Sequence, residues 1–286
     1  AQVAVLGVSM TFDEVEAVHD DNLTVGRGEL VALVGPSGCG KSTLLAAIAG
    51  LLQPDRGEIW LDGALAPTRL GQVALMPQRD ALLPWRTVLD NTVIGLEVAG
   101  VDKREARERA RTLLPRFGLA GFGDHYPAAL SGGMRQKLGL VMAVLHEPEL
   151  LVLDEPSTGV DPVSRVELWR LIAQAAAGGA AVVMSTSYLD EAERASCISV
   201  LDQGRTITVG SRDEVMAAWP GTITEPSKPT NPDRAWRRGD TIREWHPDAE
   251  DPPEGPVVAS ADLAFEDVVI ARLLNDRQHT AGAVSP

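Results

Sequence analysis

The chain has 286 residues, of which 44% are hydrophobic and 23% are charged, as in a soluble globular protein with one large core and at most a smaller appendage. Its net charge of −14 argues against a general nucleic-acid binder, which needs a basic face to replace the counterions on phosphate. The two cysteines lack metal-ligand spacing, so neither a disulfide framework nor a zinc site is expected, and a reducing cytosol fits.

Short apolar runs separated by helical patterns recur along the chain: VALVG at 31–35, ELLVLD at 149–154, AAVVM at 180–184 and ISVLD at 198–202. Runs this apolar are typical of strands covered on both faces, as in a parallel sheet flanked by helices. The predicted fold class is therefore α/β. The longest apolar run, near 138–145, is shorter than the roughly 20 residues of a membrane span, and no signal peptide is predicted.

GPSGCGKS at 35–42 follows the first of these predicted strands and opens a helical stretch. The spacing fits G-x-x-x-x-G-K-[ST], in which backbone N–H groups surround phosphate, the lysine meets the terminal phosphates and the hydroxyl binds Mg²⁺. The alternative is a glycine-rich turn that binds nothing. The candidate nucleotide contacts are Gly35, Ser37, Gly38, Gly40, Lys41, Ser42 and Thr43.

Between about 79 and 147 the sequence becomes helix-forming, with Asp102 as the expected N-cap of a helix over 102–117 and a solvated charged face. We interpret this segment as a helical subdomain inserted into the sheet. Within it, ALSGGMRQK at 129–137 places Ser131 as an N-cap and two glycines at a helix start, which is itself an anion site. One phosphate loop already satisfies a triphosphate, so this second site is expected to face another nucleotide; the alternative is an ordinary capped helix.

LLVLDEP at 150–156 ends a buried strand with two adjacent acids. Beside a phosphate loop, Asp154 is placed to hold Mg²⁺ through water, and Glu155 to orient or deprotonate the attacking water. Alone, such a pair is as readily explained by helix capping.

After about 217 the composition changes, since the tail from Pro220 carries nine of the 19 prolines. RAWRRGDTIREWHP at 234–247 interleaves arginine with tryptophan, which suits nucleic acid or a membrane surface, but a small folded extension packed on the main domain is favoured. In the later run LAFEDVVIARLL at 263–274, a packing face at helical spacing is predicted from Phe265, Val268 and Val269.

Taken together, GPSGCGKST, the glutamine of MPQ, LSGGMRQ, LLVLDEP and STGVDP make the chain resemble the nucleotide-binding subunit of ATP-binding cassette (ABC) transporters. The resemblance covers about residues 3–217. It implies a P-loop NTPase (RecA-like) core over 1–217 with the helical subdomain at about 79–147, and a C-terminal extension over 218–286.

The resemblance also implies a head-to-tail dimer of two cassettes, identical or related. ATP would lie between one subunit's phosphate loop and the other subunit's Ser131, Gly132 and Gly133. By the same resemblance Phe12 stacks on adenine with Val18 beside it, although Phe12 alone would be interpreted as core. The family further implies the following roles: Gln78 senses Mg²⁺ and the γ-phosphate, residues 79–85 face the coupling helix of a transmembrane permease, and Asp161 communicates across the dimer or caps a helix before Pro162.

The strand end at 184–193, MSTSYLDEAE, departs from the family pattern. Most members carry there a histidine that contacts the γ-phosphate, and Ser187 stands at that position. Loss of one such donor would lower the rate on the order of 10²–10³-fold, unless Ser187 acts through a water. This replacement resembles drug exporters of the daunorubicin-resistance type and the first cassette of tandem multidrug exporters, and the segment at 263–274 resembles their terminal helix.

Residues 78–101 instead resemble sulfonate- and nitrate-type importers. From the whole chain we predict an ATP- and Mg²⁺-dependent motor on the cytoplasmic face of the membrane, serving an exporter of drugs or other amphipathic compounds. The alternatives are an importer motor and a slowly hydrolysing ATP clamp in a heterodimer. A non-transport ABC protein acting on ribosomes or DNA is disfavoured by the acidic charge.

Overall fold

The computed structural model describes residues 3–65, 72–79, 81–217, 219–248 and 256–283. Asp80 and the expected boundary at Ala218 lie outside these ranges. At the centre is a six-stranded sheet of order β10-β9-β3-β8-β7-β6. Its strands β3, β6, β7, β8 and β9 run parallel, as predicted, and β10 is an antiparallel edge strand. They span Leu30–Val34, Val73–Met76, Leu150–Asp154, Ala181–Thr186, Cys197–Asp202 and, for β10, Arg205–Gly210.

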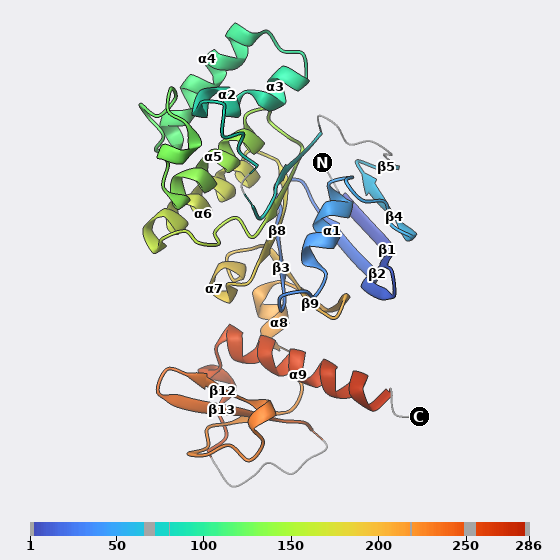
Figure 1. The fold of residues 1–286 in the computed structure, drawn as a ribbon. Helices are drawn as coiled ribbons and strands as arrows, with labels where there is room; N and C mark the ends of the chain where they lie inside the picture. Colours follow the sequence, from blue (N-terminus) through green and yellow to red (C-terminus); the bar gives the residue numbers. More distant parts are fainter. Residues whose placement is uncertain (1–2, 66–71, 80, 218, 249–255, 284–286) are drawn as a thin grey trace.

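The central strands are apolar throughout because both faces of the sheet are covered. In β3, Ala32 and Val34 point into a core shared with the helices, whereas Val31 and Leu33 point into a second core on the other face. Helix α1 (Lys41–Ile48) packs on that second face, between the central sheet and a separate antiparallel sheet (Figure 1). The antiparallel sheet, of order β2-β1-β4-β5, contains Val3–Phe12, Val15–Val25, Arg56–Leu61 and Ala64–Leu65 as β1, β2, β4 and β5.

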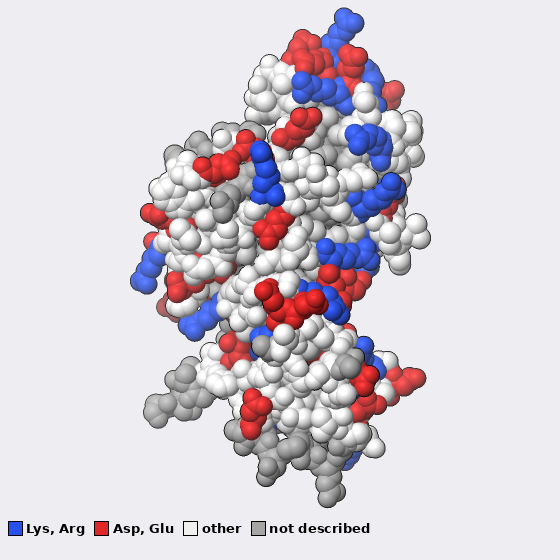
Figure 2. All heavy atoms as spheres, turned by 180° about the vertical axis from the view of Figure 1, so that it is seen from behind, with Lys and Arg blue, Asp and Glu red and all other residues white. Residues whose placement is uncertain are grey.

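Helices fill the segment between β6 and β7: α2 (Val88–Thr92), α3 (Ile94–Val98), α4 (Lys103–Leu113) and α5 (Gly132–Val144), with 3₁₀ turns at Leu114–Phe117 and Pro127–Ala129. Asp102 caps α4 as predicted, because its carboxylate accepts from the N–H groups of Arg104 and Glu105. Only Ala106 and Ala110 of α4 are buried. On the face seen in Figure 2, the basic and acidic side chains of this end of the molecule are intermixed.

Three further helices lie along the remaining connections: α6 (Pro162–Ala177), α7 (Leu189–Ala192) and α8 (Arg212–Ala217). Leu168 and Ile172 of α6 belong to the same core as α5 and the central sheet. No helix within the described ranges is both long and apolar enough to cross a bilayer.

The C-terminal tail, from residue 219 on, folds into a small unit with a sheet of its own, at the bottom of Figure 1. A sheet of order β11-β13-β12 comprises Thr222–Thr224, Thr241–His246 and Ala235–Arg238, and α9 (Phe265–Ala283) packs against it. The tryptophans of the Arg/Trp segment turn inwards: Trp245 is fully buried, and the indole of Trp236 donates to Asp267. Phe265, Val268 and Val269 are buried, as the predicted packing face requires.

Candidate functional site

A pocket of about 340 Å³ opens at the carboxyl ends of β3, β6, β7 and β8, the edge at which parallel sheets bind ligands. Each of these strands is followed by residues that line the pocket. They are Ser37, Gly38, Gly40, Lys41, Ser42 and Thr43 after β3, Gln78 after β6, Glu155 and Thr158 after β7, and Ser187 and Tyr188 after β8, together with Ala17 of β2. The fold thus gathers into one cavity most of the residues that the sequence singled out for phosphate, magnesium and water.

The loop between β3 and α1 is closely packed from behind by other backbone. A Cβ atom on Gly35 would lie 2.1 Å from the carbonyl oxygen of Leu201, and one on Gly40 would lie 2.3 Å from that of Ala17. Gly40 also has a φ of +104°, a conformation that only glycine adopts without strain. The side chain of Lys41 curls back over the loop, where its Nζ donates to the carbonyl oxygens of Gly35 and Pro36 at 2.8 and 3.0 Å.

Behind the loop, a chain of hydrogen bonds joins Ser42 to the two acids after β7. Ser42 Oγ donates to Asp154 Oδ1 at 3.1 Å, and Ser185 Oγ donates to the same oxygen at 2.6 Å. The N–H group of Glu155 in turn donates to Ser185 Oγ at 2.8 Å. The sequence marked Ser185 only as one of three hydroxyl residues at a strand end, without a role, yet its hydroxyl fixes the orientation of the acid expected to hold the metal.

Glu155 lies at a bend of the chain, with a φ of +48° that is unusual for a residue with a side chain. The residue as a whole is 6% exposed. Its carboxylate accepts three hydrogen bonds. They come from Ser187 Oγ at 2.6 Å, Ser187 N at 3.1 Å and Thr158 Oγ1 at 3.2 Å. Ser187 therefore lines the pocket and holds the carboxylate of Glu155 in a fixed orientation.

The third hydroxyl of the strand end, that of Thr186, faces a different acid. Thr186 Oγ1 and Ser157 Oγ both donate to Glu191 Oε2 at 2.8 Å, and Glu191 is 1% exposed. Arg165 of α6 contacts the same carboxylate, with its Nε 3.6 Å from Glu191 Oε1, and its guanidinium lies over the ring of Tyr188 at 4.3 Å. Each hydroxyl of the Ser-Thr-Ser run thus binds an acid, and the run couples β8 to the loop after β7.

The second candidate anion site lies at the start of α5, apart from the residues that line the pocket. Ser131 caps this helix as predicted, accepting from the N–H group of Met134, and its side chain is exposed. Asp161 caps α6 through the N–H groups of Val163 and Ser164, which confirms the helix-capping interpretation. Hydrogen bonds from the backbone and side chain of Ser164 lower the pKa of Asp161.

The two residues expected beside adenine differ in exposure. Phe12 ends β1 and is 45% exposed, so its ring is accessible to a ligand. Val18 is fully buried in the core beneath the antiparallel sheet, which removes its side chain from the surface; its neighbour Ala17 lines the pocket instead. The expectation that Val18 lies beside the adenine base is therefore corrected, because its side chain packs in the core.

The oxygen atoms of Ser42 and Asp154 fit Mg²⁺ that arrives with phosphate. Magnesium is bound in proteins by one or two carboxylates, with phosphate oxygens and waters completing its shell. In the part of the chain that the structure describes, no three His, Cys, Asp or Glu residues form a cluster able to hold a metal by themselves.

Comparisons with known proteins identify the family. The family model described as "ABC transporter" matches residues 18–158. The daunorubicin resistance ATP-binding protein DrrA3 of Streptomyces coeruleorubidus is 39% identical over 223 residues, which cover 75% of this chain and 70% of that protein. The chain belongs to the ABC transporter family of ATP-binding proteins.

Importers are also among the relatives of this ABC protein. The aliphatic sulfonates import ATP-binding protein SsuB 2 of Pseudomonas aeruginosa is 44% identical over 170 residues, covering 59% of this chain and 60% of that protein. The chain spans 52% to 60% of the length of the first three curated relatives it matches. The exporter subtype expected from the sequence is not established by these relatives.

A solved structure extends the match to the fold. The dimeric post-hydrolysis state of the ATP-binding cassette MJ0796, bound to ADP and Pi, superposes with a TM-score of 0.68 at 26% identity. The match covers 73% of this chain and 98% of that chain. The P-loop NTPase fold of an ABC cassette, predicted from the sequence, is confirmed.

Proposed function

We propose that this protein is the ATP-hydrolysing motor subunit of a membrane transporter. The observation that carries the proposal is the single pocket in which Lys41, Ser42, Gln78 and Glu155 meet at the ends of three strands, β3, β6 and β7. A glycine turn that binds nothing would not require Gln78 and Glu155 beside it. The close approach of backbone behind Gly35 and Gly40 supports a loop shaped to present its N–H groups to phosphate.

In this proposal the residues in and around the pocket have separate roles. The loop N–H groups and Lys41 bind the phosphates, and Ser42, Gln78 and Asp154, the last through water, hold Mg²⁺. When bound, Mg²⁺ neutralises charge that develops on the phosphoryl oxygens. Glu155 orients the attacking water or accepts its proton, and Ser187 keeps the Glu155 carboxylate directed into the pocket.

Ser131, Gly132 and Gly133 are proposed to complete the pocket of a second cassette. All three lie outside this chain's own pocket; Ser131 and Gly132 are exposed at the helix start, whereas Gly133 is buried. Ser37 and Thr43 line the pocket that this helix start would face in the second cassette. The MJ0796 structure, whose name describes a dimer with ADP and Pi, supports a dimeric arrangement. Phe12, exposed at the end of β1, is proposed to stack on the adenine base.

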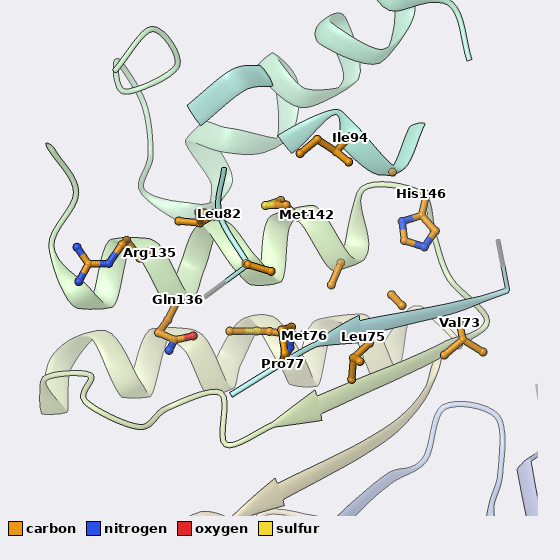
Figure 3. A pocket seen from close by; sticks show the side chains of 15 residues that line it. Val73, Leu75, Met76, Pro77, Leu82, Ile94, Arg135, Gln136, Met142 and His146 are labelled. Carbon is orange, nitrogen blue, oxygen red and sulfur yellow. The ribbon is translucent and has the colours of Figure 1, made fainter. Parts of the chain in front are cut away.

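A transmembrane permease is the proposed partner at a second, apolar pocket of about 230 Å³ between β6, α3 and α5 (Figure 3). Leu82, Ile94 and Met142 line its wall, and α5 runs along it from Arg135 to Ala143, with His146 just beyond the end of the helix. Burial lowers the pKa of His146, which favours its neutral form in this pocket. Gln78 directly precedes the segment that contributes Leu82, so nucleotide contacts and docking contacts share one connection. The protein would then work at the cytoplasmic face of the membrane.

Export of drugs or other amphipathic compounds is the proposed direction, supported by Ser187 and by the long alignment with the daunorubicin resistance protein. Import is the second candidate, favoured by the sulfonate-import relative. Deletion of the gene in its source organism separates them. A fall in daunorubicin tolerance with normal growth on an alkanesulfonate as sulfur source supports export; the reverse pattern supports import.

Steady-state ATPase measurements on the full chain test the motor itself. Glu155→Gln should lower kcat on the order of 10²-fold or more, since it removes the general base, and Lys41→Ala should weaken Mg-ATP binding. Glu193→Gln is the matched control, because Glu193 forms a surface ion pair with Arg212 outside the pocket. A wild-type protein that binds Mg-ATP but hydrolyses it no faster than Glu155→Gln would support the clamp, and unchanged binding in Lys41→Ala would refute the site.

A further inference from the structure

The C-terminal unit, residues 219–283 with the gap at 249–255, is joined by an ion pair to the end of β9, beside the phosphate loop. Arg277 of α9 donates from Nε to Asp202 Oδ2 at 2.6 Å and from Nη2 to Asp202 Oδ1 at 3.2 Å. The side chain of Asp202 is 3% exposed, whereas that of Arg277 is 47% exposed. Both carboxylate oxygens of a buried acid are therefore satisfied by one guanidinium from the tail, in the two-point geometry that is the strongest for this pair.

Asp202 ends β9 in a turn that supports the phosphate loop. Two residues further on, Gly204 donates its N–H to the carbonyl of Cys39 at 3.0 Å, and its own carbonyl accepts from His19 N at 2.7 Å. One residue earlier, the carbonyl oxygen of Leu201 is the atom that a Cβ on Gly35 would meet. The turn and the end of β9 thus contact the loop at Gly35 and at Cys39. Helix α1 begins at Lys41, two residues after Cys39.

The helix that carries Arg277 is itself fixed in place. Phe265 and Val269 of α9 belong to the main core, and Arg272 donates to the backbone carbonyl of Val215 in α8 at 3.0 Å. α9 also contacts β9 and β10, the two strands on either side of the turn. A rigid helix that holds Asp202 can constrain the turn, and the turn constrains the loop.

From these contacts we infer that Arg277 is a positioning residue for nucleotide binding: through Asp202 and the β9–β10 turn, the C-terminal unit sets the conformation of the phosphate loop and hence its affinity for nucleotide. This inference rests on the proposed function, because it assumes that the loop binds nucleotide. Without Arg277, a buried carboxylate would lack its counter-charge beside the loop, and the turn would move to hydrate it. A negative charge left uncompensated at that place also opposes the phosphates.

The test is the dissociation constant of Mg-ADP, measured by titration calorimetry on the full chain. Mg-ADP avoids turnover, and wild-type binding is the independent check on the proposed function. Arg277→Gln should weaken binding about tenfold, within the usual range of coupling between sites. Arg277→Lys keeps the charge but loses the two-point contact, so it should restore part of the affinity.

Arg238→Gln is the matched control, because Arg238 pairs at 2.9 Å with Asp267, another fully buried acid, but within the C-terminal unit. It should lower the midpoint of urea unfolding while leaving the Mg-ADP dissociation constant unchanged. A general loss of stability does not alter the affinity of the folded fraction, so only positioning predicts a difference between the two variants. Equal shifts in both variants, or a wild-type constant in Arg277→Gln, overturn the inference; should Arg277→Gln not fold, a wild-type constant in Arg277→Lys does so.

Discussion

The hydroxyl of Ser187 contacts the carboxylate of Glu155 directly. Ser187 Oγ donates a charge-assisted hydrogen bond to Glu155 Oε1 at 2.6 Å, one of three hydrogen bonds that fix the carboxylate. We predict that Ser187→Ala lowers kcat about tenfold with little change in KM, since a hydrogen bond to a charged group contributes about 1.5–3 kcal/mol.

Ser187→Thr keeps the hydroxyl and serves as the control; it should retain most of the wild-type kcat. Ser187→His tests whether the chain can use the histidine that the sequence resemblance leads us to expect at this position. A wild-type kcat in Ser187→Ala would show that Glu155 does not need this contact.

The glycines of the phosphate loop give a second prediction for single residues. Gly40→Ala forces a Cβ to within 2.3 Å of the Ala17 carbonyl, whereas a Cβ on Gly38 meets nothing within 4 Å. Both have positive φ, so both variants carry the conformational penalty of about 1 kcal/mol. Urea unfolding should therefore show a clearly larger loss in Gly40→Ala, by about 2 kcal/mol more; equal losses would contradict the tight packing behind Gly40.

Glu191 connects three elements: the end of β8 through Thr186, the loop after β7 through Ser157, and α6 through Arg165. Its replacement by alanine leaves two buried hydroxyls and an arginine without their common partner. We predict a loss of unfolding free energy of about 3 kcal/mol and a severalfold lower kcat, because Ser157 and Thr186 adjoin the segments that carry Glu155 and Ser187. Thermal unfolding and ATPase assays of Glu191→Ala measure the two effects.

Glu193 offers a comparison with Glu191 on the same segment. Glu193 lies two residues away and pairs with Arg212 at the surface, where such pairs contribute less than about 1 kcal/mol. Glu193→Ala should therefore leave both stability and kcat close to wild type. If the two variants behaved alike, the buried network would have no special importance.

Asp21 of β2 links the antiparallel sheet to β10, since its carboxylate accepts from Thr206. Desolvation by burial raises the pKa of Asp21 above its ordinary value. The folded protein then binds more protons than the unfolded chain between the two pKa values, so this group's contribution to stability falls as pH rises through that window. Asp21→Asn should be more stable than wild type at pH 7 by roughly 1 kcal/mol.

The advantage of Asp21→Asn should shrink as the pH is lowered to about 4, the ordinary pKa of an aspartate. Urea unfolding at pH 4.5 and 7 measures it. Asp13→Asn, at an exposed turn with positive φ, is the control and should show no such trend. A constant difference between Asp21→Asn and wild type at both pH values would be inconsistent with a raised pKa.

The local sequence was sufficient to predict the strands that are buried on both faces and the phosphate loop. Strands such as β3 and β7 are apolar throughout because both faces are covered, and the spacing of the loop at 35–42 is set by its own backbone. The antiparallel sheet was not predicted, because β1 and β2 pair with repeated register shifts, for example between Val5 and Val8, that break the alternation of buried and exposed residues.

The partners of site residues likewise depend on distant segments. The sequence marked Ser187 and Glu155, but 32 positions separate them, and nothing local indicates that their side chains meet. The sequence assigned no partner to Ser185 and Thr186 at the end of β8, or to Glu191 in α7. The role of Ser185 follows from the parallel pairing of β7 with β8, which brings it opposite Asp154.

On the scale of the whole molecule, α9 packs against both the C-terminal unit and the cassette. Phe265 and Val269 are buried in the main core, whereas Val268 and Ala271 are buried in a small core with Ile223 and Trp245. Figure 1 shows the helix lying between the small sheet and the rest of the chain. Because one helix contributes to both cores, neither can lose its packing without exposing apolar surface of the other.

We therefore predict a single unfolding transition in calorimetry. Val268→Ala removes methyl groups from the small core and Val269→Ala from the main core, each costing about 1–2 kcal/mol. Both variants should lower the midpoint of the same transition to a similar extent, since the cores unfold together. Two separate transitions, with Val268→Ala moving only the weaker one, would mean that α9 transmits no stability between the units. The coupling inferred for Arg277 would then have to act through the ion pair alone, without support from the packing of the helix that carries it.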